Sequence, residues 1–253
     1  MTLTVRQFPC LSDNYGFLVR DDASGKTACV DTPDAAAILA QLQAQGWGLD
    51  FILNTHWHPD HAGGNAEIKA ATGCQVVGPA EVTRIAPLDR TVKGGDVVEL
   101  GETRFGVIEA GGHTLGHIAY FDPADRIAFV GDTLFALGCG RLFEGKPEQM
   151  WASLSRLAAL PDDTRVYCAH EYTAANARFA LSLDEAPALK RRAQEVFAAR
   201  ERGEPTVPTT IGLEKATNPF LRAPALANRV GKSGAPDHEA FAAVRAAKDA
   251  FKG

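Results

Sequence analysis

The stretch THWHPDHAGGN, residues 55–65, decides the fold because it gathers metal-binding side chains in one short loop. Four residues of it can bind a metal ion: His56, His58, Asp60 and His61. On an extended backbone, side chains two positions apart point to the same side, so the first two histidines can reach one ion. The proline after them turns the chain and redirects the aspartate and the third histidine, which allows a second ion. The apolar run FIL just before this loop predicts a buried strand.

Three further candidate ligands each come directly after a predicted strand: His113 in GGHTLGH, Asp132 in FVGDTLF and His170 in YCAHEYT. Sites in open α/β sheets gather at the carboxyl ends of strands, and this shared placement is independent of the first loop. Of the other two histidines, we expect His117 to support a ligand or the local structure and His238 to have no role at the metal site.

Seven candidate ligands predict two divalent ions, because a catalytic zinc-type site uses about three protein ligands and leaves one position open for water. The expected division is His56, His58 and His113 for one ion, Asp60, His61 and His170 for the other, and Asp132 bridging both. Ions roughly 3.5–4 Å apart can share a hydroxide nucleophile, and we expect Asp60 and Asp132 to be catalytic. Mixed imidazole and carboxylate ligands suit zinc, iron or manganese.

The composition limits the classes of function. The chain has 253 residues and 45% hydrophobic content, which suits a main domain with an appendage. A net charge of -5 provides no basic field for nucleic acid or an anionic membrane. We expect no membrane span and no secretory signal, and hence a cytoplasmic protein. Five scattered cysteines without a C-x-x-C motif argue against a disulfide framework, and Cys139, between two glycines, is the one most able to react.

The pattern of apolar and turn residues changes after residue 170. Before it, strands alternate with helices, and two packed sheets with outer helices are expected. The predicted strands lie near residues 5–8, 17–19, 28–30, 51–54, 75–77, 97–100, 103–109, 118–121, 126–130 and 164–168, and the helices at 34–45, 65–71 and 147–160. Beyond it, helices are expected at 172–181, 186–200 and 239–251, with no strand between them. We therefore predict a mixed domain at 1–170 and a helical domain at 171–253.

Four motifs in this order, THWHPDH, GHTLGH, GDTLF and AHEYT, resemble the metallo-β-lactamase superfamily. A narrower resemblance, to glyoxalase II or the hydroxyacylglutathione hydrolases, rests on GCGRLFEG, HEYTAANARFA, ATNPFLR and the terminal RAAKDAF. It covers essentially the whole chain. The resemblance implies an α+β fold, namely an αββα sandwich with a C-terminal helical domain that helps to bind glutathione.

The resemblance also implies an activity: hydrolysis of the thioester S-D-lactoylglutathione to glutathione and D-lactate, the second step of methylglyoxal detoxification. We expect the protein to be a monomer. It implies the same metal ligands and places the substrate contacts at Arg141, Phe143, Tyr172, Asn176, Arg245 and Lys248. The family often has tyrosine at the position of Phe143 and lysine at that of Arg141, so substrate affinity is expected to differ from that of relatives. Without the resemblance, Arg245 and Lys248 would fit any solvated helix face, because they are three residues apart.

Other functions stay open on the residues alone. A glutathione persulfide dioxygenase with a single iron would share much of the first domain, but it would not need Asp60, His61 and His170 all as ligands. A hydrolase of another ester or lactone, or a metal-binding module without catalysis, is a further alternative. The complete set of seven ligands favours the hydrolase with two ions.

Overall fold

The computed structural model describes residues 3–253, which form two compact units. The first unit comprises residues 3–109 and 116–131, and the second comprises residues 110–115 and 132–253. No helix within residues 3–253 is long and apolar enough to cross a membrane.

The first sheet of the first unit carries the candidate metal loop. Its strands, in spatial order, are β1 (Leu3–Cys10), β2 (Asn14–Asp21), β3 (Thr27–Val30), β4 (Phe51–Leu53), β5 (Gln75–Gly78) and β6 (Arg90–Thr91). The first three strands pair antiparallel, whereas β3 to β6 pair parallel. Parallel neighbours need crossover connections, and the helices between these strands supply them.

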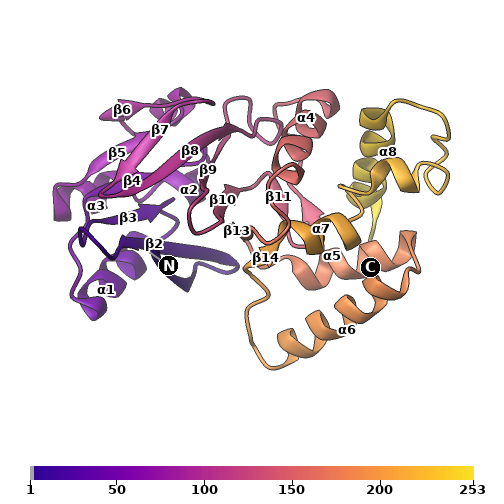
Figure 1. Ribbon diagram of the computed structural model, residues 1–253, viewed down its shortest axis with the longest axis horizontal. Helices are drawn as coiled ribbons and strands as arrows, with labels where there is room; N and C mark the ends of the chain where they lie inside the picture. Colours follow the sequence, from indigo (N-terminus) through magenta and orange to yellow (C-terminus); the bar gives the residue numbers. More distant parts are fainter. Residues whose placement is uncertain (1–2) are drawn as a thin grey trace. The chain divides into compact units, whose positions relative to one another are not determined.

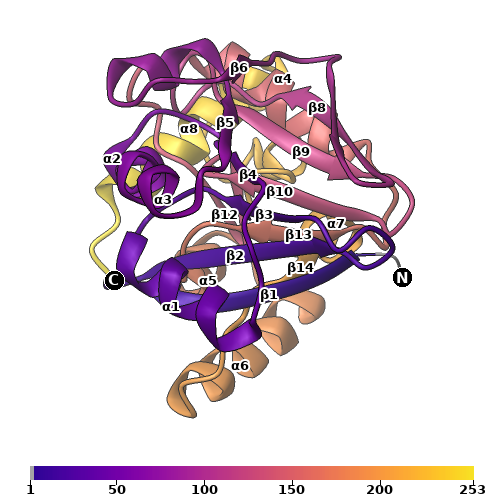
Figure 2. The ribbon, with the colours of Figure 1, turned by 90° about the vertical axis from the view of Figure 1, so that its left-hand side faces the viewer.

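Helices α1 (Ala35–Gln45) and α3 (Asn65–Thr72) pack on one face of this sheet, against β2 and β5 (Figure 2). The short helix α2 (Pro59–Ala62) and the 3-10 helix η1 (Ala80–Arg84) lie in the connections. Helix α1 begins after Asp34, whose side chain accepts a hydrogen bond from the Ala37 amide, and it ends at Gly46 with φ 65°. An N-cap acid and a left-handed glycine are common helix boundaries, so these ends follow from local sequence.

The part of the second sheet that lies in the first unit is an antiparallel meander of β7 (Val97–Leu100), β8 (Thr103–Glu109), β9 (Ile118–Asp122) and β10 (Ile127–Gly131). It packs against the first sheet through aromatic side chains. The rings of Phe17 on β2 and Phe129 on β10 lie 5.6 Å apart, and Phe105 on β8 lies 6.3 Å from Phe129. Strand alternation turns the neighbouring Leu18 to the other face, where it joins the core beneath α1 and α3. The first unit therefore has two sheets face to face, with α1 and α3 on the outer face of the first sheet.

The second unit is mainly helical (Figure 1). Its elements are β11 (Leu134–Phe135), β12 (Gly138–Cys139), α4 (Pro147–Ala158), β13 (Arg165–Cys168), α5 (Thr173–Leu183), α6 (Pro187–Glu201), β14 (Thr209–Thr210), α7 (Ile211–Thr217), the 3-10 helix η2 (Ala223–Leu226) and α8 (Asp237–Ala250). Helix α5 packs along α6, and α4 packs against α8. The buried apolar residues of α5 and α6 form one core cluster.

The prediction of no strand beyond residue 170 is wrong, because β14 pairs antiparallel with β13. Thr209 and Thr210 form only two positions of strand, which is too short for an alternating pattern to be recognised. Helix α7 and the hairpin of β11 and β12 were not predicted either, because they too are short for a periodic pattern to be recognised. The domain division at residues 170/171 stays a prediction.

Candidate metal centre and substrate cavity

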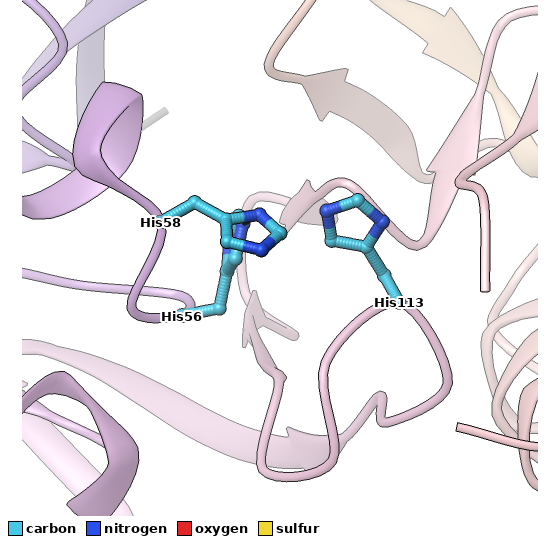
Figure 3. A group of neighbouring side chains, drawn as sticks. All are labelled: His56, His58 and His113. Atoms are coloured by element: carbon cyan, nitrogen blue, oxygen red, sulfur yellow. Dashed lines mark hydrogen bonds between the residues drawn. The ribbon is translucent and has the colours of Figure 1, made fainter. Parts of the chain in front are cut away.

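In the first unit, His56 and His58 project from the loop that follows β4, with their rings close together (Figure 3). The Nε2 atom of His56 lies 3.0 Å from the Nδ1 atom of His58. Two nitrogens bound at about 2.1 Å to one tetrahedral ion lie about 3.4 Å apart, so this pair has nearly the spacing that one ion requires. The third histidine drawn in Figure 3, His113, belongs to the second unit.

Asp31 orients two of the candidate ligands, a role that sequence reasoning missed. Its carboxylate lies 2.8 Å from His61 Nδ1 and accepts hydrogen bonds of 2.8 Å from the Thr55 amide and hydroxyl. The same hydroxyl lies 3.0 Å from His56 Nδ1. Metal-bound histidines typically use one ring nitrogen for such a bond and present the other to the ion, so the arrangement fits a metal site. The sequence feature that could have indicated this role is an acidic residue directly after a predicted strand, which Asp31 shares with Asp132.

Replacing Asp31 by asparagine is expected to weaken metal binding about 10- to 100-fold, because the amide has one acceptor oxygen where the carboxylate has two. Equilibrium dialysis against zinc or manganese would measure the change. Asp34→Asn is the matched control, since asparagine also caps a helix well. Equal metal affinity in Asp31→Asn and the wild type would contradict an orienting role.

Asp60 and His117 complete the first unit's part of the site. The side chain of Asp60 is 39% exposed, and its Oδ2 lies 3.6 Å from His61 Nε2. The buried Asn14 amide donates to the same oxygen over 3.1 Å. His117 is buried and stacks on His56 with ring centroids 4.6 Å apart. Its place beside the ligand ring agrees with a supporting role.

In the second unit, Asp132 lies between two histidines. Its two carboxylate oxygens are 3.4 Å from His113 Nε2 and 3.3 Å from His170 Nε2. The Nδ1 atom of His113 is 2.8 Å from the Arg141 carbonyl oxygen, and His170 stacks against Tyr172 at 4.7 Å. All three candidate ligands are buried, so their polar atoms need partners other than bulk water. His238 instead pairs with Glu148, with a 3.7 Å separation.

A cavity of about 520 Å³ in the second unit opens onto His113 and Asp132. Its lining includes all six predicted substrate contacts: Arg141, Phe143, Tyr172, Asn176, Arg245 and Lys248. Three of these six are cations, so the cavity suits a small molecule with carboxylates. The structure thus brings together residues from 113 to 248 that the sequence keeps far apart. Their role as substrate contacts stays a prediction.

Arg245 and Lys248 are two of the three cations on the cavity wall. Arg245 is buried, donates to the Cys139 carbonyl oxygen over 3.0 Å and pairs with Asp249 at 2.8 Å. Burial lowers the pKa of the Lys248 ammonium, and the nearby guanidinium groups lower it further. Neighbouring cations repel one another, so a bound anion would reduce this electrostatic repulsion.

Cys139 also lines this cavity, and burial raises the pKa of its thiol to about 11. The thiol therefore stays protonated near neutral pH and is a poor nucleophile. All five cysteines are buried and free. The reactivity considered for Cys139 finds no support in this environment.

Two family models together match most of the chain. The model described as "Metallo-beta-lactamase superfamily" matches residues 27–170, and the one described as "Hydroxyacylglutathione hydrolase C-terminus" matches residues 171–251. A relative from Erythrobacter litoralis, named hydroxyacylglutathione hydrolase, is 58% identical over 98% of this chain and 100% of its own. A relative from Maricaulis maris with the same name is also 58% identical, over 98% of this chain and 99% of its own.

The chain belongs to the hydroxyacylglutathione hydrolase family. This membership confirms the fold class expected from the sequence, an αββα sandwich with a C-terminal helical region, and the expected enzyme family. The histidine and aspartate donors, together with the superfamily fold, indicate a site for divalent metal. A more distant solved structure, of a protein in a di-iron-bound form, is 28% identical and covers 86% of this chain and 100% of its own, with a TM-score of 0.63.

Proposed function

We propose that this hydroxyacylglutathione hydrolase family member cleaves the thioester of S-D-lactoylglutathione and related 2-hydroxyacylglutathiones, releasing glutathione and a 2-hydroxy acid. One observation carries the proposal: a single cavity is lined both by candidate metal ligands and by three cations. The names of relatives at 58% identity support the same substrate. That the protein is a cytoplasmic monomer and acts in methylglyoxal detoxification stays a prediction.

For the metals we propose two ions with the ligands expected from the sequence. The proposed ligands are His56, His58, Asp60, His61, His113, Asp132 and His170. The chemistry of the donors supports this, as does the di-iron-bound form of the related protein at 28% identity. When bound, divalent ions at such a site lower the pKa of water and stabilise negative charge that develops on an oxygen. Zinc, iron and manganese all suit these donors.

The protein's own side chains would bind the substrate and direct it. Glutathione carries two carboxylates, which Arg141, Arg245 and Lys248 can pair with. The departing thiolate needs no strong general acid, because an ordinary thiol has a pKa near 8.5. Asp60 would accept a hydrogen bond from the attacking water and aim it at the thioester carbonyl carbon.

The lowered pKa of Lys248 gives an expected pH dependence. A group with a depressed pKa loses its positive charge at a lower pH than an ordinary lysine, whose pKa is near 10.4. The KM for the glutathione thioester should therefore rise with pH before the ordinary lysine range is reached. Lys248→Arg should move this rise to higher pH, because a guanidinium stays charged. Steady-state kinetics, corrected for spontaneous hydrolysis, would measure it, and identical pH profiles for both proteins would contradict it.

One experiment decides between the proposed hydrolase and the persulfide dioxygenase considered from the sequence. Metals per chain are measured on the purified protein, and S-D-lactoylglutathione hydrolysis is assayed beside oxygen consumption with glutathione persulfide. Two metals per chain with thioester cleavage are expected. One iron, oxygen uptake and no thioester cleavage would overturn the proposal.

A further inference from the structure

The small hairpin of β11 and β12, residues 134–139, connects a candidate metal ligand with the cavity's cationic wall. Asp132 comes two residues before it and directly after β10, whereas Arg141 comes two residues after it. Two of its residues, Phe135 and Cys139, line the cavity themselves. The place of Arg141 along that wall therefore depends on the hairpin, while Asp132 is fixed by its own strand.

Side chains from the helical region bind the hairpin backbone at five successive residues. The Asn218 amide donates to the carbonyl oxygens of Phe135 and Gly138, over 3.1 and 2.9 Å. The Asn176 amide donates to the Ala136 carbonyl oxygen over 3.1 Å, and Arg245 donates to the Cys139 carbonyl oxygen over 3.0 Å. In the opposite direction, the Leu137 backbone amide donates to the Glu214 carboxylate over 2.9 Å. Two strands of two residues each cannot hold such a turn by pairing alone. These side chains therefore define its conformation.

Leu137, at the turn, is held against its own backbone preference. Its φ of 57° lies in the left-handed region, which an amino acid with a branched side chain rarely adopts. Its side chain is fully buried and joins the core cluster of α5 and α6, which includes Ala177 and Leu189. Such a conformation persists only when its surroundings determine it, and here the surroundings are the core and the Glu214 carboxylate.

Asn218 and Glu214 are themselves fixed by buried contacts. The Asn218 side chain accepts a hydrogen bond of 2.9 Å from the Phe220 amide and donates to Glu214 over 2.9 Å. Glu214 pairs with buried Arg192 and accepts a hydrogen bond from the Thr209 hydroxyl. Asn218 lies in the motif ATNPFLR, to which the proposed chemistry assigns no task.

We propose that Asn218, with Glu214, is a positioning residue that sets substrate binding by fixing the hairpin that carries the backbone to Arg141. The inference rests on the proposed function, because the substrate is taken to be a glutathione thioester. Neither residue is among those that line the cavity. Loss of the Asn218 amide removes its hydrogen bonds to two hairpin carbonyl groups, and the segment up to Arg141 can then take other positions. Binding of the glutathione part should suffer more than bond cleavage, because Arg141 belongs to the cationic wall, although its carbonyl oxygen also lies 2.8 Å from His113 Nδ1.

The test compares two substrates with the same acyl group: S-D-lactoylglutathione and the D-lactoyl thioester of a small uncharged thiol. Asn218→Ala is expected to raise KM for the glutathione thioester about tenfold, as expected for one or two lost hydrogen bonds, with a smaller change for the small thioester. Asn218→Ser, a milder change, covers the case in which the alanine variant does not fold. Asp184→Ala is the control, since it removes an ion pair with Arg222 in the helical region and no bond to the hairpin.

Hydrogen exchange provides a second measurement that does not depend on activity. Amides of residues 134–141 should exchange faster in Asn218→Ala than in the wild type, and at the wild-type rate in Asp184→Ala. Equal losses of kcat/KM on both thioesters, or unchanged exchange in this segment, would overturn the proposal. A wild-type protein that leaves S-D-lactoylglutathione intact would refute the proposed function, and the exchange result would still show whether Asn218 fixes the hairpin.

Discussion

Replacing Asp132 by alanine is expected to lower kcat/KM for S-D-lactoylglutathione on the order of 10³-fold and to reduce the metal bound per chain. The carboxylate is buried between His113 and His170, with separations of 3.4 and 3.3 Å. As the proposed shared ligand, it would act on both ions at once. Metal ions contribute several kcal/mol of transition-state stabilisation, and each 1.36 kcal/mol corresponds to a tenfold change in rate.

Metal analysis and steady-state kinetics on the same preparation would measure this effect. Asp162→Ala is the control, because this exposed acid forms only a surface ion pair with Lys215 at 2.8 Å, and such pairs contribute little. An Asp132→Ala enzyme with two ions per chain and wild-type turnover would exclude the proposed bridging role.

Replacing Gly140 by alanine is expected to lower kcat/KM about 10²-fold, although the change adds only one methyl group. A Cβ at this position would lie 1.9 Å from the Asp132 carbonyl oxygen and 3.1 Å from His113 Nδ1. The first contact is with backbone, so the chain itself has to shift. A displacement of about 1 Å at a reacting group can cost 10²-fold in rate.

Gly48→Ala is the matched control for this prediction, since a Cβ there meets nothing within 4 Å. Circular dichroism and thermal melting would show whether each variant folds. Steady-state kinetics would then show whether kcat/KM falls in Gly140→Ala and not in Gly48→Ala. If Gly140→Ala kept wild-type kinetics, the close approach of this backbone to the candidate ligands would have no catalytic importance.

Much of the fold follows from local sequence. The hairpin at 97–100 and 103–109 has the bounds that its apolar runs and glycine turn predict, and α1 ends where its cap residues indicate. By contrast, β11, β12 and β14 have two residues each. They exist because tertiary contacts hold them, so no periodicity in the sequence could reveal them.

The candidate site divides in the same way. The metal loop and the acids and histidines at strand ends could be recognised because their chemistry is unusual and their spacing is local. Arg245 and Lys248 needed a family resemblance, since their spacing fits any exposed helix. The tasks of Asp31 and Asn218 could not be read from the sequence, because each acts on residues far along the chain: Asp31 on His61, and Asn218 on Phe135.

The bonds between the hairpin and the helical region limit how this protein could have been assembled or could be recombined. A break at residues 170/171 would place the hairpin on one fragment and Asn176, Glu214, Asn218 and Arg245 on the other. A helical segment from another protein, joined at that point, would remove these side-chain partners from five backbone groups of the hairpin, whichever substrate that segment binds. New substrate ranges would then arise by changes along the cavity wall more readily than by exchange of the whole appendage.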